Sequence, residues 1–209
     1  MSINLEKQKL KKNNKITKFS EIFLEKNKVI NLISKNDEKV LFEKHIFDSL
    51  AISYFFEKYN ITPNGLTLLD IGTGGGFPAV PIAINYKDLN VVGLDSIAKK
   101  IRAIEEFKQE LQLDNLTLIN DRAENIQTEY DIVVSRAVSK LSKVVQYAMP
   151  LLKSGGYFVC YKSKSAFDEI REAKDIILKN KAEFLEVIEY KLPLEENFDR
   201  FLVVVKKKF

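Results

Sequence analysis

Residues 66–81 read LTLLDIGTGGGFPAVP, and the rest of the chain can be interpreted from this segment. Its first six residues, up to Ile71, are mostly apolar, as in a buried strand. The glycines that follow allow the backbone to turn sharply and to approach a ligand closely. Pro78 and Pro81 then open an apolar segment that predicts a helix, because the N–H groups of a first turn have no intrahelical partner. Strand, turn and helix together predict a nucleotide-binding crevice.

The spacing of the glycines distinguishes two kinds of ligand. The dinucleotide fingerprint requires glycines at positions one, three and six, but the sixth position counted from Gly72 is Phe77. Gly72, Gly74 and Gly76 instead alternate, and Asp70 lies two positions upstream. This pattern resembles motif I of methyltransferases that use S-adenosylmethionine (SAM), a ligand that needs close backbone approach rather than a phosphate cradle. A tight turn without a ligand is the alternative interpretation.

The composition of the 209 residues predicts one domain with an extension. Hydrophobic residues make up 45%, enough for a sizeable core, and no apolar run reaches membrane-spanning length. The first residues lack the apolar core of a signal peptide, so we expect a cytoplasmic protein. With one cysteine, Cys160, and one histidine, His45, we expect neither an internal disulfide nor a metal site.

Charge is unevenly distributed along the chain. The formal net charge is +4, yet residues 1–44 contain eleven lysines and six acidic residues, a balance of +5. A basic segment next to a nearly neutral one suggests a polyanionic partner. Charge alone is equally consistent with lysines that only solvate exposed helix faces. A second small basic cluster, Lys206 to Lys208, lies near the other end.

Residues 1–60 predict a basic helical extension, and a turn-rich break at residues 60–65 separates it from a second part, residues 61–209. Two groups of apolar residues recur at helical spacing: Ile16, Phe19, Ile22 and Phe23, and then Val29, Ile30 and Ile33.

A further helix is expected over residues 40–50, capped by Asn36 or Asp37. His45, Asp48 and Ser49 would share one face of it. A serine next to an aspartate on the same helix cannot form a hydrolase relay. We therefore expect a polar stripe that packs over the pocket or caps a neighbouring element.

From residue 66 onward, strands and helices alternate, which predicts a parallel, doubly wound sheet. Expected strands are 66–71, 90–94, 116–120, 130–134 and 157–161, and expected helices are 79–84, 97–111 and 141–152. Residues 153–156 read Lys-Ser-Gly-Gly and predict a helix stop. Residues 184–190 and 201–205 read as two strands with no helix between them, and so predict a final antiparallel pair.

The ends of these strands carry candidate ligand-binding residues. Asp95 follows the second strand, 21 positions after Gly74, where an acid commonly accepts hydrogen bonds from ribose hydroxyls. A helix N-cap is the alternative role for Asp95, and Ser96 would serve it equally well. Ala123, after the third strand, is small enough to lie beside a flat adenine ring. Arg136, in the predicted loop 135–137, would face the transferable methyl group.

The same loop limits the acceptor. It lacks the Asn/Asp-Pro-Pro-aromatic box that prepares exocyclic amines. Methylation at C5 of a pyrimidine needs a cysteine nucleophile, whereas Cys160 lies within a strand and is expected in the core. The N7 atom of guanine has a free lone pair and no proton, so transfer to it needs alignment rather than a base. Guanine N7 is favoured, while hydroxyl and small-molecule acceptors stay open.

Six segments in this order resemble the bacterial RsmG (GidB) methyltransferases. They are NKVINL (27–32), HIFDS (45–49), DIGTGGGFP (70–78), LDS (94–96), RAE (122–124) and SRA (135–137). The resemblance extends from about residue 27 to 207. It implies a Rossmann-like class I fold with a seven-stranded, mostly parallel sheet, and methyl transfer from SAM to guanine N7 of 16S ribosomal RNA, either naked or in the small subunit.

The resemblance also implies particular cofactor contacts. They come from Gly72, Phe77, Ala123, Glu124 and Arg136, to which the glycine motif adds Gly74 and the strand-end argument adds Asp95. It implies no general base. Two departures from the family pattern are Gly75, where proline is common, and Ala79, where glycine is common.

Two other functions compete with the ribosomal RNA methyltransferase. A small-molecule methyltransferase would leave the basic first 44 residues unexplained. A non-catalytic RNA-binding module would have no reason to keep Asp70, Asp95 and Glu124 intact. A monomer is expected, because the sequence shows no strong hydrophobic patch.

Overall fold

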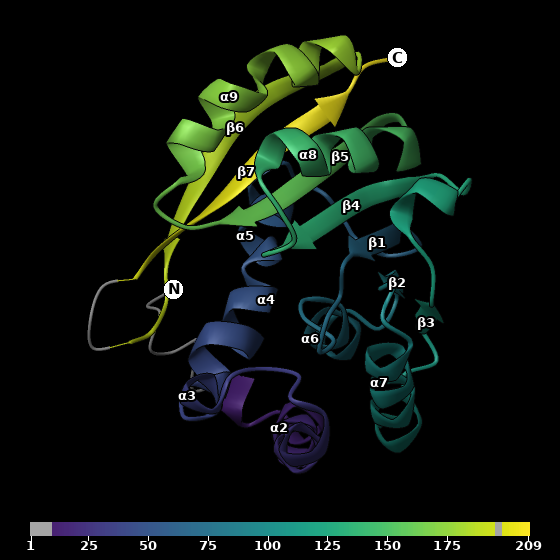
Figure 1. Ribbon diagram of the computed structural model, residues 1–209, viewed down its shortest axis with the longest axis vertical. Coiled ribbons are helices and arrows are strands. Elements are labelled where there is room, and N and C mark those ends of the chain that lie inside the picture. Colours follow the sequence, from purple (N-terminus) through teal and green to yellow (C-terminus); the bar gives the residue numbers. More distant parts are fainter. Residues whose placement is uncertain (1–9, 195–197) are drawn as a thin grey trace.

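The computed structural model describes residues 10–194 and 198–209, which build one sheet between two layers of helices (Figure 1). The strand order is β3-β2-β1-β4-β5-β7-β6. The first five strands pair in parallel, and β7 is antiparallel to both β5 and β6, so the predicted seven-stranded, mostly parallel sheet is confirmed. The strands are β1 (Thr67–Ile71), β2 (Asn90–Leu94), β3 (Leu116–Ile119), β4 (Tyr130–Arg136), β5 (Leu152–Lys162), β6 (Ala182–Lys191) and β7 (Asp199–Lys207).

Helices cover both faces of this sheet (Figure 1). One layer contains α8 (Leu141–Ala148) and α9 (Ala166–Lys179), of which α9 was not predicted; the other contains α2 (Asn14–Ile30), α5 (Ile52–Lys58), α6 (Ala79–Asn85) and α7 (Ala98–Leu111). A hydrophobic core lies on each face of the sheet. Successive residues of β1 point to opposite faces, so Leu68 belongs to the core beneath the layer with α2 and α7, and Leu69 to the core beneath α8 and α9. No helix in the described residues has the length and apolar character needed to cross a bilayer.

Aromatic packing joins helix α2 to the sheet domain. Phe19 and Phe23 of α2 are fully buried, and their rings lie 5.6 and 5.0 Å from the ring of Phe77. Phe107 of α7 completes the cluster at 5.6 and 5.8 Å from the same two rings. Each such pair adds about 0.5–1.5 kcal/mol beyond area burial. A Cβ at Gly75 would lie only 3.1 Å from the Phe23 ring, so α2 packs directly against the glycine loop.

The second apolar group of the amino-terminal segment was interpreted wrongly as part of a helix face. Helix α2 ends at Ile30 because Asn31 takes a left-handed conformation, with φ of 54°. Val29 is consequently 80% exposed, and Ile33 lies beyond the helix.

The helix predicted over residues 40–50 is also divided, and its predicted caps are wrong. Asn36 and Asp37 lie inside a short helix, α3 (Lys35–Glu38), whose cap is the Ser34 hydroxyl. A π-helix, η1 (Phe42–Phe47), follows it and continues into α4 (Asp48–Leu50). Such wide turns occur frequently at functional sites.

Two predicted boundaries near the sheet were wrong as well. Ser135 and Arg136 belong to β4, since they pair with Cys160 and Tyr161 of β5, and the loop begins only at Ala137. Residues 153–156, predicted as a helix stop, lie within β5. A 3-10 turn, η3 (Met149–Leu151), ends the preceding helix instead. The pairing of β5 with β4 passes from Leu152 to Tyr157, so residues 153–156 form an irregularity inside a continuing strand and not a helix stop.

The prediction that Cys160 is a core residue is confirmed. Cys160 is 2% exposed, and burial raises the pKa of its thiol to about 12. A thiol with such a pKa does not supply the thiolate that nucleophilic catalysis requires.

Candidate active site

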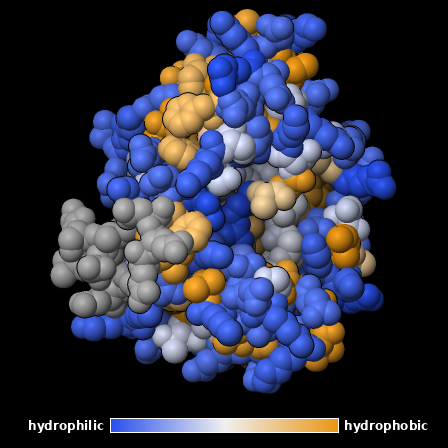
Figure 2. Space-filling view, turned by 60° about the vertical axis from the view of Figure 1, so that its left-hand side comes forward, coloured by the Kyte–Doolittle hydropathy of each residue, from blue (hydrophilic) through white to orange (hydrophobic). Residues whose placement is uncertain are grey.

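A cavity of about 560 Å³ lies at the carboxyl ends of β1, β2 and β4, where the strand order reverses. It brings together all seven residues predicted to contact a cofactor: Gly72, Gly74, Phe77, Asp95, Ala123, Glu124 and Arg136. The molecule is hollowed near its centre, with blue and pale residues inside the hollow (Figure 2). Val138 and Tyr147 also line the cavity but belong to no motif, and Leu32, the last residue of the NKVINL segment, lines it without having been predicted as a contact.

The glycine loop adopts a backbone that other residues rarely take. Gly72, Gly74 and Gly76 have φ values of +74°, +60° and +95°, all in the left-handed region. A Cβ at Gly72 would lie 2.4 Å from Cγ2 of Val138, so the side chain of Val138, in the loop after β4, packs directly on the Gly72 backbone. The two loops therefore form one continuous wall of the cavity.

Asp95 connects the glycine loop to helix α7. Its Oδ2 accepts a hydrogen bond from the Gly74 N–H at 2.9 Å, and its Oδ1 accepts one from the Ile97 N–H at 2.9 Å. The second bond precedes α7, whose N-cap residue is Ile97 and which has no side-chain cap, so neither Asp95 nor Ser96 caps this helix. Each carboxylate oxygen has a further lone pair. Asp95 can therefore also accept hydrogen bonds from a ligand in the cavity that it lines.

Asp70 lies beneath the loop and does not line the cavity. It is fully buried, and its Oδ2 accepts a hydrogen bond from the Ala79 N–H at 3.2 Å, at the start of α6. Its Oδ1 has no hydrogen-bond partner among the described residues. Burial raises the pKa of Asp70 to about 7.

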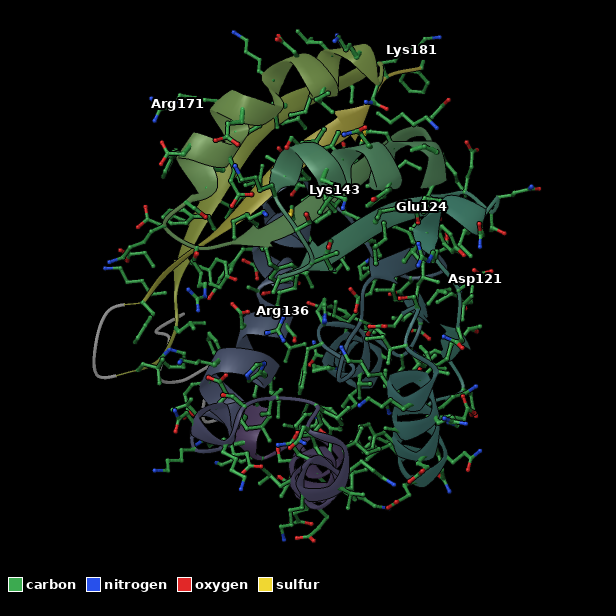
Figure 3. All side chains as sticks on the ribbon, viewed as in Figure 1. Asp121, Glu124, Arg136, Lys143, Arg171 and Lys181 are labelled. Atoms are coloured by element: carbon green, nitrogen blue, oxygen red, sulfur yellow. The ribbon has the colours of Figure 1, made fainter. Side chains whose placement is uncertain are left out.

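Arg136 connects the end of β4 to the helical segment around η1, and it points from the sheet toward that segment (Figure 3). Its Nη1 donates to the Lys44 carbonyl and to Asp48 Oδ2, both at 3.1 Å. Its Nη2 lies 3.0 Å from His45 Nδ1, and its Cζ lies 5.3 Å from the centre of the Phe77 ring. The guanidinium is therefore held on several sides, with the side chain only 15% exposed.

Asp48 is the centre of a wider network. Its Oδ1 accepts a hydrogen bond from the Tyr190 hydroxyl at 2.6 Å and lies 3.8 Å from Arg200 Nε. Ser49 instead donates its hydroxyl back to the His45 carbonyl. The expectation that the polar stripe packs over the pocket is confirmed for His45, which lines the cavity.

The partner of His45 determines which nitrogen carries its proton. A guanidinium can only donate hydrogen bonds, so Nδ1 of His45 accepts and the proton of the neutral ring is on Nε2. Burial and the nearby Arg136 charge lower the pKa of His45 to about 4. His45 is therefore neutral at physiological pH, with its basic nitrogen already occupied, and does not act as a general base.

This lowered pKa predicts a pH-dependent contribution of His45 to stability. Between pH 6.5 and 4 the unfolded chain protonates this histidine while the folded chain does not. The contribution is therefore fully present above pH 6.5 and is lost as pH falls toward 4. We expect the difference in unfolding free energy between the wild type and His45→Gln to shrink over this interval in chemical denaturation at several pH values.

The buried Asp70 also changes stability over this pH range, in the direction opposite to His45. Its pKa is raised from 3.8 to about 7, so its contribution falls as pH rises through this range. The stability of the wild type alone mixes both effects, whereas the comparison with His45→Gln isolates the histidine. A difference that stays constant from pH 4 to 6.5 would contradict the lowered pKa.

Several amino-terminal lysines have structural partners. Lys15 and Lys18 of α2 donate their ammonium groups to the carbonyls of Gln112 and Glu110, at 3.1 and 2.8 Å, where α7 ends. Lys26 forms an ion pair with Glu106 of the same helix. Part of the basic excess therefore attaches α2 to α7. Lys7 and Lys9, which also contribute to the excess, lie outside the described residues.

The sequence of the chain matches a known protein family. A family model described as rRNA small subunit methyltransferase G matches residues 12–198. The ribosomal RNA small subunit methyltransferase G of Lysinibacillus sphaericus (strain C3-41) is 35% identical over 196 residues, covering 91% of this chain and 80% of that protein. The protein of the same name from Bacillus subtilis (strain 168) is 35% identical over 195 residues, covering 90% and 80%.

Solved structures share the fold at low sequence identity. The magnesium protoporphyrin IX methyltransferase of Synechocystis PCC 6803, with bound SAM, has a TM-score of 0.64 at 15% identity, covering 84% of this chain and 85% of that chain. M. jannaschii TYW2, in complex with AdoMet, has a TM-score of 0.58 at 17% identity, covering 76% of each chain. These likenesses confirm the predicted Rossmann-like class I fold.

Proposed function

Because the chain belongs to the rRNA small subunit methyltransferase G family, we propose that its glycine-loop cavity holds SAM and serves methyl transfer to 16S ribosomal RNA. The chain is a SAM-dependent methyltransferase of 16S ribosomal RNA, and its acceptor is N7 of a guanine. The observation that carries this conclusion is the family match over residues 12–198, which includes most elements around the cavity.

The residues around the cavity fit SAM. The left-handed glycines expose backbone rather than side chains, which suits the close approach of the methionine part. Asp95 would accept hydrogen bonds from the ribose hydroxyls, and Ala123 and Glu124 would lie beside the adenine. Gly72, Gly74, Phe77 and Arg136 would complete the contacts. SAM, when bound, supplies a methyl group that is activated by its positively charged sulfur.

Two titratable residues next to the cavity, His45 and Asp70, are not placed to act as a base. His45 has its basic nitrogen engaged by Arg136, and Asp70 lies under the loop rather than in the cavity. Guanine N7 has a lone pair and no proton to remove. The residues of the chain therefore need to align the acceptor and exclude water, which is sufficient for a large acceleration.

Four further points belong to the same proposal. The partner is 16S ribosomal RNA, naked or in the small subunit, and the location is the cytoplasm, where such particles are made. The enzyme acts as a monomer. This is supported by the scatter of its exposed apolar side chains, because residues such as Val29, Phe167 and Phe184 come from different elements. Residues 1–60 serve as a helical extension to a SAM-binding domain formed by residues 61–209.

The direct test is methyl transfer from labelled SAM to small ribosomal subunits, and to their extracted RNA, from cells that lack this enzyme. We expect nucleoside mass spectrometry to find 7-methylguanosine at one position, and the preferred particle identifies the substrate form. The rate of methyl transfer should fall steeply with added salt, because lysine and arginine side chains that bind RNA phosphates compete with the added cations. Intact SAM binding without any RNA product would contradict the proposal and favour a small-molecule acceptor.

A further inference from the structure

A second cavity, of about 520 Å³, adjoins the glycine-loop cavity. The two share His45, Arg136, Ala137 and Val138 and have no other lining residue in common. The volume is within the range of about 300–1,000 Å³ that is typical of small-molecule sites. Two other cavities of the described residues, one beside α2 and one beside α5, share no residue with the glycine-loop cavity.

Arg136 forms the partition between the two cavities. On one side its guanidinium faces the ring of Phe77, which lines only the first cavity. On the other side it bonds Asp48 and the Lys44 carbonyl, whose residues line only the second. Ala137, next in sequence, has a φ of 56°, which is uncommon outside glycine. Such strain persists where the surrounding structure enforces it, and it is frequent at functional sites.

The second cavity has charged walls whose charges are paired. Lys44 lies 3.4 Å from Asp37, Lys162 lies 2.6 Å from Glu169, and both Arg136 and Arg200 lie beside Asp48. Four cations therefore face three carboxylates, with a neutral His45 at the partition. Paired charges present many donors and acceptors but little net charge. Such a surface suits a neutral, polar ligand better than an apolar or strongly anionic one.

The geometry of methyl transfer requires an acceptor cavity of this kind. The acceptor atom must approach the methyl group in line, at about 3–3.5 Å, from the side opposite the sulfur. A base inside an RNA fold cannot reach this position without leaving its stack. The cavity that receives it must therefore open into the cofactor cavity, as the second cavity does at Arg136 and Val138.

We propose that the second cavity receives the target guanine as a flipped base and that Arg136 donates a hydrogen bond to its O6. This inference rests on the proposed function. O6 is next to N7 on the same edge of guanine, so a donor at the partition would hold O6 while N7 faces the methyl group. Three of the five N–H groups of Arg136 have described partners, which leaves two for a ligand. Asp48 balances the Arg136 charge, so the guanidinium does not oppose the positive charge that N7 methylation creates.

The first test fills the cavity. Ser163, an exposed residue just after β5, lines the second cavity and not the first. We expect Ser163→Trp to raise the KM for the RNA substrate about tenfold, while the Kd for SAM stays within about twofold of the wild type. Ser154→Trp is the matched control, because Ser154 is also exposed but lies near the amino end of β5 and lines neither cavity. It should leave both constants unchanged.

The second test changes the base and keeps the enzyme intact. The guanine that mass spectrometry maps is replaced by inosine, which keeps O6, or by 2-aminopurine, which lacks it. We expect inosine to bind nearly as well as guanine, and 2-aminopurine to raise the KM about tenfold or more, because a charged donor would lose its acceptor. This comparison stays decisive even if Ser163→Trp fails to fold, which its SAM affinity would reveal.

The outcomes separate this inference from the proposed function. A wild-type enzyme that forms no 7-methylguanosine would overturn the proposed function itself. A wild type that forms it, with an unchanged RNA KM in folded Ser163→Trp, would show that the base enters elsewhere. Equal use of inosine and 2-aminopurine would overturn the role of Arg136 in holding O6.

Discussion

Asp48→Ala is expected to lower the free energy of unfolding by about 3–5 kcal/mol. Asp48 is 4% exposed and is the shared anion of Arg136 and Arg200, as well as the acceptor for the Tyr190 hydroxyl. Its removal leaves a buried guanidinium without a counter-charge and a buried hydroxyl without its acceptor. Both are costly because the interior solvates them poorly. Denaturation in urea, compared with the wild type, measures this loss.

Asp168→Ala is the matched control for this loss. Asp168 also pairs with an arginine, Arg171, one helical turn away, but their side chains are 70% and 79% exposed. An exposed pair of this kind contributes about 0–1 kcal/mol. If Asp48→Ala costs no more than Asp168→Ala, the network around Arg136 does not stabilise the fold.

Gly72→Ala is expected to weaken SAM binding by about 10–100-fold. Gly72 has a φ of +74°, and its added Cβ would lie 2.4 Å from Cγ2 of Val138. Strain at such a position costs about 1–3 kcal/mol, and the loop would shift away from the cavity to relieve it. Isothermal titration with SAM, alongside thermal unfolding, separates the loss of affinity from the loss of stability.

Two further variants identify the cause. Gly65→Ala introduces a side chain at a similar φ of +78°, but nothing lies within 4 Å of the new Cβ. It should lower stability and leave SAM affinity unchanged, because Gly65 lies outside the cavity. Val138→Ala in the Gly72→Ala background removes the colliding Cγ2 atom and should recover part of the affinity. No recovery would mean that backbone strain, rather than the contact with Val138, causes the loss.

Local patterns were sufficient for much of the fold and for the cofactor cavity. Residues at the carboxyl ends of parallel strands must meet at one edge of a sheet. For this reason Gly72, Asp95 and Ala123 could be predicted to line one crevice from their order along the chain, and they do line it. The resemblance then added Phe77 and Glu124.

The boundaries that failed were those where local signals competed with pairing elsewhere. Ser135 and Arg136 were predicted in a loop, yet they pair with Cys160 and Tyr161 of β5. Residues 153–156 express their turn signal as an irregularity within β5, between the paired residues Leu152 and Tyr157. The interpretation of the amino-terminal lysines was incomplete for a different reason. Their number suggested a polyanion partner, but a count of charges cannot show that Lys15 and Lys18 bond the end of α7.

By itself, the sequence determined the alternation of strands and helices, the glycine loop and the class of ligand, because each depends on near neighbours along the chain or on the fixed geometry of parallel strands. The role of the HIFDS segment (45–49) could not be predicted in this way. His45 and Asp48 contact Arg136, which is 91 and 88 positions away along the chain, and Tyr190 is 142 positions from Asp48. Only the folded chain brings these groups together, because a contact between the helical segment around η1 and the ends of β4 and β6 leaves no pattern in the local sequence.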